Sequence, residues 1–385
     1  MELSDIINHL GEERNEYYNS VAPPIVRTSN FCFASVEEMR CNINKEFEVP
    51  FYTRGNNPTV SILRKKMAAL EKTEDALITS SGCAAISAAV FGNLSAGDHA
   101  ICVKNCYSWT HTLFNDILRR FGVHVSIIDG TRVEFFKNAI TPHTRLIMLE
   151  SPTSFMMELQ DLRAIAALAK THEITTVIDN SYSTPLFQNP AEMGIDIVVH
   201  SASKYLGGHS DLIAGVICSS EKMIRRLFAQ EYLAFGGIIT PDNAWLILRG
   251  MRTLPLRMNQ VYQTCRKVVD FLEDHPKVEK VLWPFAKSFP QSELASKQMK
   301  GAGGLFSFTL KTKEMERVDA FCNKLKHFLL ACSWGGHESL VFPASVLYSS
   351  QNNNKELPFN LVRMNIGLEE ADVLIADIQQ ALEHV

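Results

Sequence analysis

The sequence predicts an α/β protein, with a mainly parallel sheet in a large unit and a smaller carboxy-terminal α+β unit after it. Short β-branched runs alternate with helical stretches of about ten residues between residues 59 and 204, which is typical of parallel sheets. The composition shifts near residue 245, where a longer helical stretch begins. Because 385 residues exceed one ordinary core, two folded units are the default expectation.

Composition and charge exclude several functional classes. The chain is 46% hydrophobic and 21% charged, with a formal net charge of −4 and no basic block, so we expect no nucleic-acid binding. Nine cysteines are scattered without a C-x-x-C pair, which favours reduced thiols over disulfides or a metal site. The amino-terminal stretch lacks a secretory apolar region, and no run of about 18 apolar residues occurs. We therefore expect a soluble, cytoplasmic protein without membrane contact.

The first part of the chain, residues 1–55, is interpreted as an arm. A short helix is expected near Leu3–Leu10, and a proline pair then forces an extended segment. The loop Phe51–Thr59 places Tyr52 and Arg54 two residues apart, and a guanidinium fork suits a phosphate. A solvated loop arginine is an equally good interpretation of this segment alone.

The next segments predict an anion-binding helix start. A helix over Thr59–Leu70 is followed by a short strand, Ala76–Ile78, and by a second helix over Cys83–Phe91. Small residues at 80–82 precede the second helix, where exposed backbone N–H groups and the helix dipole favour an anion. A plain helix N-cap is the simpler alternative for this segment.

Polar residues follow four of the predicted strands directly. Five strands are predicted in this part of the chain, 99–103, 123–128, 145–150, 175–178 and 195–199, with helices 112–121, 131–139 and 161–171 between them, and all but 123–128 are followed by one of these residues. The polar residues are Tyr107, Ser154, Asp179 and Lys204. Ligands of open α/β sheets lie at the carboxyl ends of the strands, so we expect these residues at one site. Asp179 alone could equally be a helix N-cap or a turn residue.

Lys204 is the candidate nucleophile. A lysine just past a buried strand is partly desolvated, which lowers the pKa of its amine, and a neutral amine forms Schiff bases with carbonyls. The hydroxyls of Ser201 and Ser203 could hold a phosphate, and the glycines at 207–208 allow close backbone approach. A lone lysine after a strand is more often an ordinary surface residue, so this hypothesis needs partners elsewhere in the chain.

The carboxy-terminal part offers a candidate carboxylate anchor. Helical residues 242–274 are expected to break near Pro255. Strands are expected near 278–282, 304–310 and 360–366, and a final helix over 369–384. Arg363 lies on the last strand, where a guanidinium would suit a substrate carboxylate. The glycines of Ser333–Leu340 could form a tight loop facing the substrate.

Six motifs follow one another along the chain: YTRGNNPT, SSGCAAI, VIDNSYSTPLFQNP, HSASKYLGGHSD, SWGGHESL and VRMNIGLE. In this order they resemble the Cys/Met-metabolism family of pyridoxal-phosphate (PLP) enzymes, from about residue 20 to the end. The resemblance implies the PLP-dependent fold type I, with a seven-stranded-type sheet. It also implies an arm at 1–55 that contacts a neighbouring subunit, a PLP-binding domain at 56–245 and a substrate-binding domain at 246–385.

The resemblance implies a role for each matching residue. Lys204 is expected to hold the cofactor as a Schiff base and to move protons, Asp179 to pair with the pyridine nitrogen, and Tyr107 to stack on the ring. Tyr52 and Arg54 resemble the pair that a neighbouring subunit contributes to the cofactor, and Tyr52 is also a candidate catalytic residue. This sharing implies a homotetramer built as a dimer of dimers.

The remaining implied contacts concern the phosphate and the substrate. The phosphate contacts implied by the resemblance are Gly82, Cys83, Ser201 and Ser203. Arg363, helped by Ser333, resembles the anchor of the substrate α-carboxylate. Trp334 and Ser154 are implied on the substrate side of the site.

Departures from the commonest family pattern bear on the exact reaction. Ser154 and Phe155 replace an asparagine and a proline, and this serine and Trp334 resemble cystathionine β-lyase. Cys332 stands where some γ-lyases carry an acid, and Trp109 lies where methionine γ-lyase has a cysteine. Other stretches look more like the γ-synthase branch. We expect cleavage of cystathionine, a sulfur-containing amino acid, to homocysteine, pyruvate and ammonia; γ-synthase or γ-lyase is the alternative, and methionine γ-lyase or an aminotransferase is less favoured.

Overall fold

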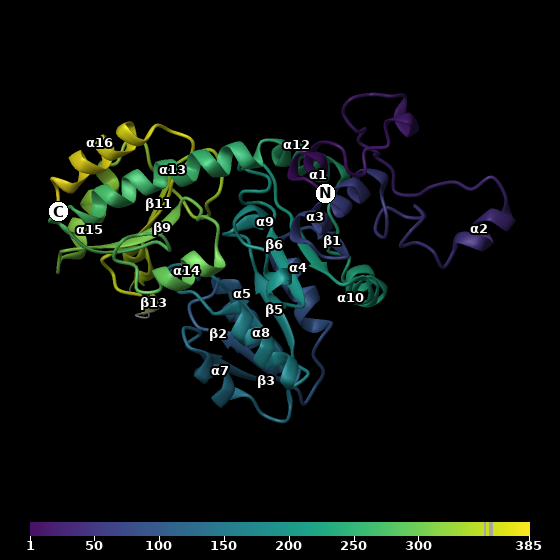
Figure 1. The fold of residues 1–385 in the computed structure, drawn as a ribbon, viewed down its shortest axis with the longest axis horizontal. Helices are drawn as coiled ribbons and strands as arrows, with labels where there is room; N and C mark the ends of the chain where they lie inside the picture. Colours follow the sequence, from purple (N-terminus) through teal and green to yellow (C-terminus); the bar gives the residue numbers. More distant parts are fainter. Residues whose placement is uncertain (350–351, 354–356) are drawn as a thin grey trace.

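The structure is a computed structural model that describes residues 1–349, 352–353 and 357–385. Two mixed sheets dominate it, one of seven strands in the centre of the molecule and one of five strands in the carboxy-terminal part (Figure 1). A short pairing of β12 (Tyr348–Ser349) with β13 (Asn352–Asn353) lies at the edge of the second part. The predicted fold class, an α/β unit with a seven-stranded sheet and a smaller α+β unit, is confirmed.

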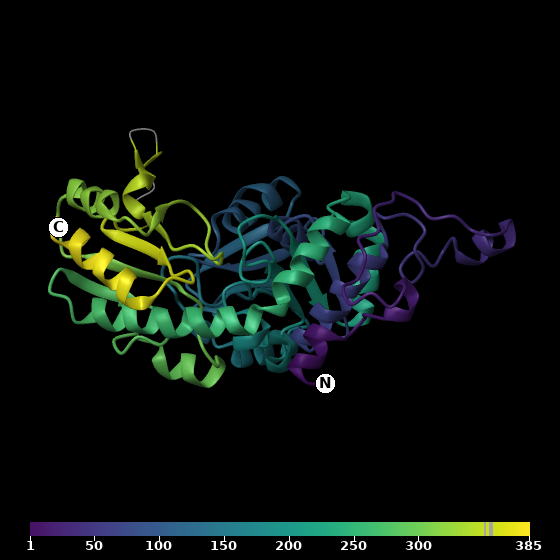
Figure 2. The ribbon, with the colours of Figure 1, turned by 90° about the horizontal axis from the view of Figure 1, so that it is seen from above.

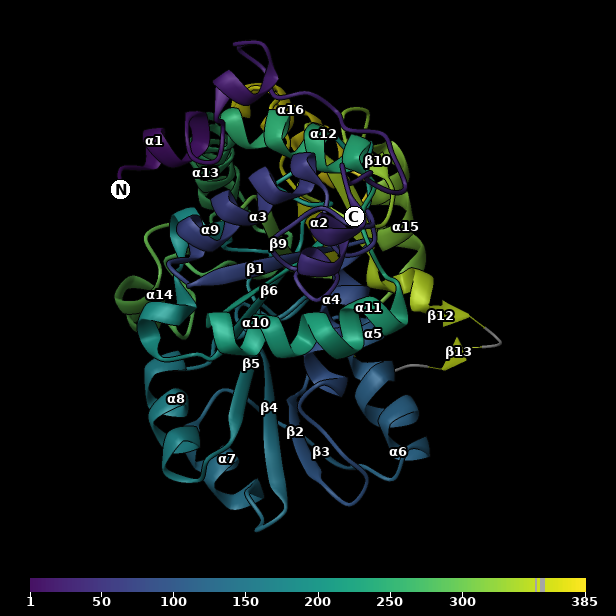
Figure 3. The same ribbon diagram turned by 90° about the vertical axis from the view of Figure 1, so that its right-hand side faces the viewer.

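The seven-stranded sheet has the order β1-β7-β6-β5-β4-β2-β3. Its strands are β1 (Asp75–Thr79), β2 (His99–Val103), β3 (His124–Ile128), β4 (Thr144–Glu150), β5 (Thr175–Asp179), β6 (Ile197–Ser201) and β7 (Gly215–Ser219). All neighbouring pairs from β6 to β3 are parallel, whereas β7 runs antiparallel to β1 and β6. Helices cover both faces, which explains why the inner strands are continuous apolar runs (Figure 3).

The helices of the large unit begin at the capping residues that the sequence provides. The side chain of Asn57 accepts from the N–H of Thr59, next to a proline at the first helical position, and Asp161 caps α8 in the same way. The helices and helical turns are α1 (Leu3–Asn8), η1 (Arg14–Tyr17), α2 (Val36–Asn42), α3 (Pro58–Glu71), α4 (Gly82–Phe91), α5 (Ser108–Thr112), η2 (Leu113–Ile117), α6 (Leu118–Arg120), α7 (Val133–Ala139), α8 (Leu162–Thr171), α9 (Thr184–Phe187), η3 (Pro190–Met193), α10 (Glu221–Leu227), η4 (Phe228–Tyr232), α11 (Leu233–Phe235) and α12 (Pro241–Arg252).

The carboxy-terminal unit contains the five-stranded sheet, in the order β10-β11-β14-β9-β8. Its elements are β8 (Val278–Leu282), α14 (Ser292–Gln298), β9 (Leu305–Leu310), α15 (Met315–Lys324), β10 (Leu329–Leu330), β11 (Leu340–Pro343), η5 (Ala344–Leu347), β14 (Leu361–Asn365) and α16 (Ala371–Leu382). The 20-residue helix α13 (Leu254–Glu273) connects the two units (Figure 1). Its first half packs in the core of the large unit, and its second half packs in the core of the small one.

Some elements differ from the sequence prediction. The strand expected over 195–199 is β6, which ends at Ser201, so Ser201 is the last strand residue rather than part of the loop. The helix break expected near Pro255 is present and lies at Thr253, because Pro255 occupies the first turn of α13, where its missing N–H is not needed. The predicted pattern lacked β7, which is short and begins with a glycine.

The first residues of the chain are anchored by a buried group of charges. Lys66 of α3 donates to the carbonyls of Ile6 and Ile7 at the end of α1, at 3.0 and 2.6 Å, and pairs with Glu12 at 2.9 Å. Glu12 also pairs with Arg252 at 3.1 Å. Beyond this anchor the arm extends away from the large unit (Figure 2). An apolar hollow on it is lined by Phe31, Cys32, Phe33, Ser35, Val36 and Met39.

Two further findings concern the chemistry of the chain as a whole. No helix within the described residues is both long and apolar enough to cross a membrane. The nine cysteines are free thiols in the structure.

Replacing Lys66 is expected to destabilise the fold. Lys66→Met keeps the volume but leaves two helix-end carbonyls and part of a buried carboxylate without their donor, so we expect a loss of about 3 kcal/mol in the free energy of unfolding. Urea denaturation measures it. The control is Lys65→Met, because the neighbouring Lys65 pairs with Glu13 at 3.7 Å in solvent and should change stability by less than about 0.5 kcal/mol. Equal losses in the two variants would contradict the anchoring role.

Candidate active site

The candidate site lies at the carboxyl edge of the seven-stranded sheet, where several parallel strands end side by side. Glu150 ends β4 and is in register with Asp179, the last residue of β5. Asp179 is in register with Val199 of β6, and Lys204 lies in the turn that follows β6. The parallel topology therefore brings together residues that are far apart in the sequence, as the sequence analysis expected.

The amine of Lys204 lies between the two units. Its Nζ donates to Oγ of Ser333 at 2.5 Å and lies 5.4 Å from the ring centroid of Trp334, both from the carboxy-terminal unit. Burial lowers the pKa of Lys204, the cation Arg363 lowers it further, and the carboxylate of Asp179 acts in the opposite direction. This environment favours a larger neutral fraction of the amine than in an exposed lysine, which is what a nucleophile requires.

The carboxylate of Asp179 is held by its own strand end. Ser181 donates to Oδ1 through its backbone N–H at 2.9 Å and its hydroxyl at 2.5 Å. The hydroxyl oxygen of Ser181 in turn accepts from the N–H of Ser201 on β6 at 2.6 Å. Both donors use Oδ1, so Oδ2 can accept from a cationic partner.

The start of α4 forms a close cradle against β6. Ser81 caps the helix by accepting from the N–H of Ala84 at 3.0 Å, and the first-turn N–H groups at Gly82 and Cys83 have no intrahelical acceptor. A Cβ at Gly82 would lie 2.8 Å from Cβ of Ser201, so only glycine allows this approach. Backbone donors and the Ser201 side chain thus come together where the sequence predicted an anion site.

Ser203 differs from Ser201 in its surroundings. Its hydroxyl oxygen accepts from the N–H of Ala214 at 3.0 Å and donates to the carbonyl of Ala214 at 3.4 Å. The Ser203 hydroxyl therefore uses part of its hydrogen-bonding capacity to fix Ala214, the residue that precedes β7. Of the two serines, Ser201 is the better placed beside the helix start.

Tyr107 lies at the start of α5 with 40% of its surface exposed. Its hydroxyl lies near enough to the side chain of Cys83 for each group to affect the pKa of the other. Burial, together with Cys83, raises the pKa of Tyr107 to about 12, so the phenol is protonated at neutral pH. The exposed ring and the cradle of α4 therefore face the same space.

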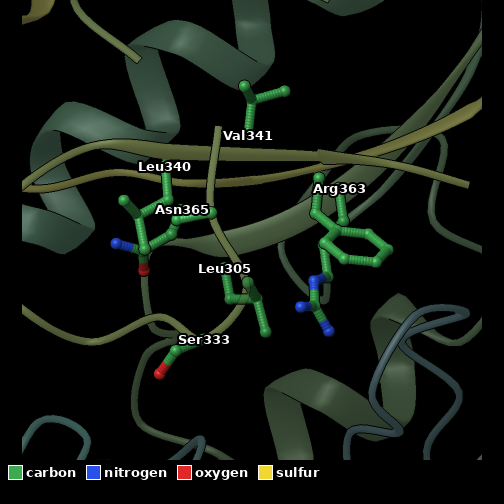
Figure 4. Close-up of a pocket in the computed structure, with 8 residues that line it drawn as sticks. Leu305, Ser333, Leu340, Val341, Arg363 and Asn365 are labelled. Carbon is green, nitrogen blue, oxygen red and sulfur yellow. The ribbon is translucent and has the colours of Figure 1, made fainter. Parts of the chain in front are cut away.

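The predicted carboxylate anchor lies in the small unit, across from Lys204. The side chain of Arg363 projects from the side of the five-stranded sheet on which the loop with Ser333 lies, whereas Val341 projects from the other side (Figure 4). The Arg363 guanidinium carbon lies 4.2 Å from the ring centroid of Phe155 and 5.4 Å from that of Phe342. Burial lowers the pKa of Arg363 to about 10, which still leaves a cation at neutral pH.

The loop around Trp334 is held in a strained conformation. Ser333 has a φ of 79° and Gly335 a φ of 83°, and a Cβ at Gly335 would lie 2.9 Å from the backbone nitrogen of Tyr205. Trp334 packs against Tyr205 and Tyr182, with ring centroids 5.4 and 6.3 Å apart. The loop thus fixes Ser333 and Trp334 beside Lys204.

Tyr52 and Arg54 lie on the amino-terminal arm. The Arg54 guanidinium carbon is 5.5 Å from the ring centroid of Tyr52, which is 43% exposed. Within the described residues, no hydrogen bond or ion pair joins either side chain to Lys204. Their assignment to the site of a neighbouring subunit stays a prediction.

Sequence reasoning missed Glu150, although it named the segment that contains it. Glu150 is buried, accepts from the N–H of Tyr107 at 2.7 Å through Oε2, and accepts from the Ser154 hydroxyl at 2.7 Å through Oε1. Burial, with the nearby Asp179, raises the pKa of Glu150 to about 8. An acid at the end of an apolar strand was the available signal, because a buried carboxyl group requires partners.

Comparisons with known proteins show which family the whole chain resembles. A family model of Cys/Met metabolism PLP-dependent enzymes matches residues 5–383. An L-methionine gamma-lyase from Fusobacterium nucleatum subsp. nucleatum is 39% identical over 384 residues, covering 98% of this chain and 97% of that protein. A cystathionine beta-lyase from Lactococcus lactis subsp. cremoris is 35% identical over 380 residues, covering 97% of both. The crystal structure of metB from Corynebacterium glutamicum has a TM-score of 0.93 and 33% identity, covering 100% of this chain and 98% of that one.

The pKa of Lys204 provides a test of this geometry. In the protein without cofactor, we expect acetic anhydride to label Lys204 at a lower pH than the exposed lysines, measured by mass spectrometry of peptides. Arg363→Gln should move the labelling midpoint upward, because a neighbouring cation is removed, and Asp179→Asn should move it downward. Midpoints that do not respond to either substitution would contradict the arrangement.

Proposed function

Because the chain belongs to the family of Cys/Met metabolism PLP-dependent enzymes and is a carbon–sulfur lyase of that family, we propose that it cleaves cystathionine by β-elimination. The products are homocysteine, pyruvate and ammonia. Trp334 is the observation that carries this proposal: its ring lies 5.4 Å from the Lys204 amine and restricts the space around it.

The residues present fit pyridoxal phosphate. The close approach of Gly82 to Ser201 supports a phosphate cradle, to which Cys83 and Ser203 would contribute. Oδ2 of Asp179 accepts no hydrogen bond from the described residues and suits a protonated pyridine nitrogen, and the exposed ring of Tyr107 offers a flat stacking surface. When bound, the cofactor supplies an electron sink for the electrons left at Cα after a proton is removed.

The chain's own residues would divide the remaining work. Lys204 would hold the cofactor and, once released from it, remove the Cα proton as a base whose pKa is lowered by burial. Arg363 and Ser333 would orient the substrate α-carboxylate, the former through a guanidinium held against two aromatic rings. Tyr107, with its protonated phenol, can donate a hydrogen bond but does not act as a base near neutral pH.

The surroundings of the amine support removal of one proton rather than two. γ-Elimination requires a second proton to leave from Cβ, so its base must reach a second position. The contacts of Lys204 with Ser333 and Trp334 limit that reach. Cys332, which precedes Ser333 and lies near Lys204 and Arg363, would present a thiol rather than a carboxylate to the substrate.

A γ-elimination is the second candidate, and a specific observation favours it. The L-methionine gamma-lyase from Fusobacterium nucleatum is more similar to this chain, at 39% identity, than the cystathionine beta-lyase from Lactococcus lactis, at 35%. The exposed Trp109 stands against it, since the resemblance places a cysteine there in methionine γ-lyase.

Product analysis tests the reaction. With purified enzyme, pyridoxal phosphate and cystathionine, we expect homocysteine and pyruvate in equal amounts, quantified by chromatography and mass spectrometry. Formation of cysteine and 2-oxobutyrate would show γ-cleavage of cystathionine and contradict β-cleavage. Release of methanethiol from methionine would favour the second candidate. Synthesis only from cysteine and an activated homoserine would indicate a γ-synthase.

The proposal extends to the assembly and its location. The exposed pair Tyr52 and Arg54, on an arm that projects from the large unit, would complete the site of a neighbouring subunit in a homotetramer. The arm would be residues 1–55, the PLP-binding domain 56–245 and the substrate-binding domain 246–385. Nine free thiols support a reducing compartment such as the cytoplasm.

Mixing two inactive variants tests the shared site. Lys204→Ala is expected to abolish turnover without unfolding the protein, and Arg54→Ala is expected to impair it strongly. Hybrid dimers then contain one site with both residues intact, so random mixing should recover roughly a quarter of the wild-type activity. Recovery no greater than the sum of the two variants alone would rule out the contribution from a neighbouring subunit. Each variant denatured and renatured by itself serves as the control.

A further inference from the structure

Glu150 joins two loops that approach the site from different directions. The loop after β2 carries Tyr107, and the loop after β4 carries Ser154. Each oxygen of the buried Glu150 carboxyl group accepts from one of these loops at 2.7 Å: Oε2 from the N–H of Tyr107 and Oε1 from the hydroxyl of Ser154. The N–H of Ser154 also donates to the carbonyl of Asn105 at 3.3 Å, so the two loops touch directly.

The second loop continues the connection to the small unit. The carbonyl of Ser154 accepts from Nη1 of Arg363 at 3.4 Å, and the next residue, Phe155, places its ring against the same guanidinium. A contiguous path of contacts therefore runs from Tyr107 through Glu150 and Ser154 to Arg363. Its two ends are the stacking surface for the cofactor ring and the anchor for the substrate carboxylate.

We infer that Glu150 is a positioning residue that sets both the Tyr107 ring and, through Ser154, the Arg363 guanidinium in the geometry that the reaction requires. The inference rests on the site roles proposed above. A carboxyl group suits this task because it has two oxygens, and each of them holds one of the two loops.

Three variants separate the two hydrogen bonds of Glu150. Glu150→Ala removes both, and Ser154→Ala removes only the bond on the side of Arg363. Glu150→Gln can keep both if the Ser154 hydroxyl turns to accept. Asp196→Ala is the matched control. Oδ2 of Asp196 also accepts from one backbone N–H and one hydroxyl, both of Thr176, at 2.8 and 2.7 Å, but it lies at the opposite edge of the same sheet.

Two readouts report the two ends of the path without requiring turnover. Visible circular dichroism of bound pyridoxal phosphate reports the setting of the cofactor ring against Tyr107. Titration with glycine, followed by the change in the visible spectrum, reports the binding of an amino-acid carboxylate by Arg363. If the protein binds pyridoxal phosphate but leaves cystathionine uncleaved, the proposed reaction fails while both readouts remain usable.

We expect Glu150→Ala to alter the visible circular dichroism and to weaken glycine binding by on the order of tenfold. Ser154→Ala should weaken glycine binding alone, and Glu150→Gln should restore most of both signals. Asp196→Ala should change neither, whatever it does to stability. The inference is overturned if Glu150→Ala matches Asp196→Ala in both readouts, or if Glu150→Gln is as impaired as Glu150→Ala, because the contacts to Tyr107 and Ser154 would then not carry the effect.

Discussion

The chemistry of this protein depends on the charges that surround the amine of Lys204. Lys204 must stay partly neutral inside the protein, and this depends on a cation, Arg363, and an anion, Asp179, that act on its pKa in opposite directions. The anion comes from the seven-stranded sheet and the cation from the five-stranded one. Neither unit alone creates this environment, so the chemistry depends on the way the two units are joined.

The strand register of the seven-stranded sheet determines where the site residues lie relative to one another. Parallel strands that end together place Glu150 beside Asp179, and the turn after the next strand holds Lys204. Burial, with the nearby Asp179, raises the pKa of Glu150, whereas the Asp179 carboxylate accepts two hydrogen bonds from Ser181. Similar residues thereby acquire different roles through burial and hydrogen bonding.

The sequence was sufficient for the fold class and for much of the site. Alternating apolar runs predicted the parallel sheet, and the position of Asp179 and Lys204 after strands predicted where they would meet. It was insufficient where a contact depends on tertiary structure alone. Nothing local indicates that Phe155 and Phe342 enclose Arg363, or that the Ser203 hydroxyl is engaged with Ala214. Strand β7 was missed because a short antiparallel run that begins with glycine has a weak pattern.

Helix α13 has a consequence for how the molecule comes apart. Leu254, Met258 and Val261 belong to the core of the large unit, whereas Cys265, Val268, Val269 and Leu272 of the same helix belong to the core of the small one. Melting either core removes the packing that keeps the shared helix intact, and the loss is transmitted along the helix to the other core. The two units should therefore unfold in one cooperative transition, even though each has a sheet of its own. Arg363 and Lys204 separate in this same transition. A chain in which only one unit is folded therefore has no partially formed active site.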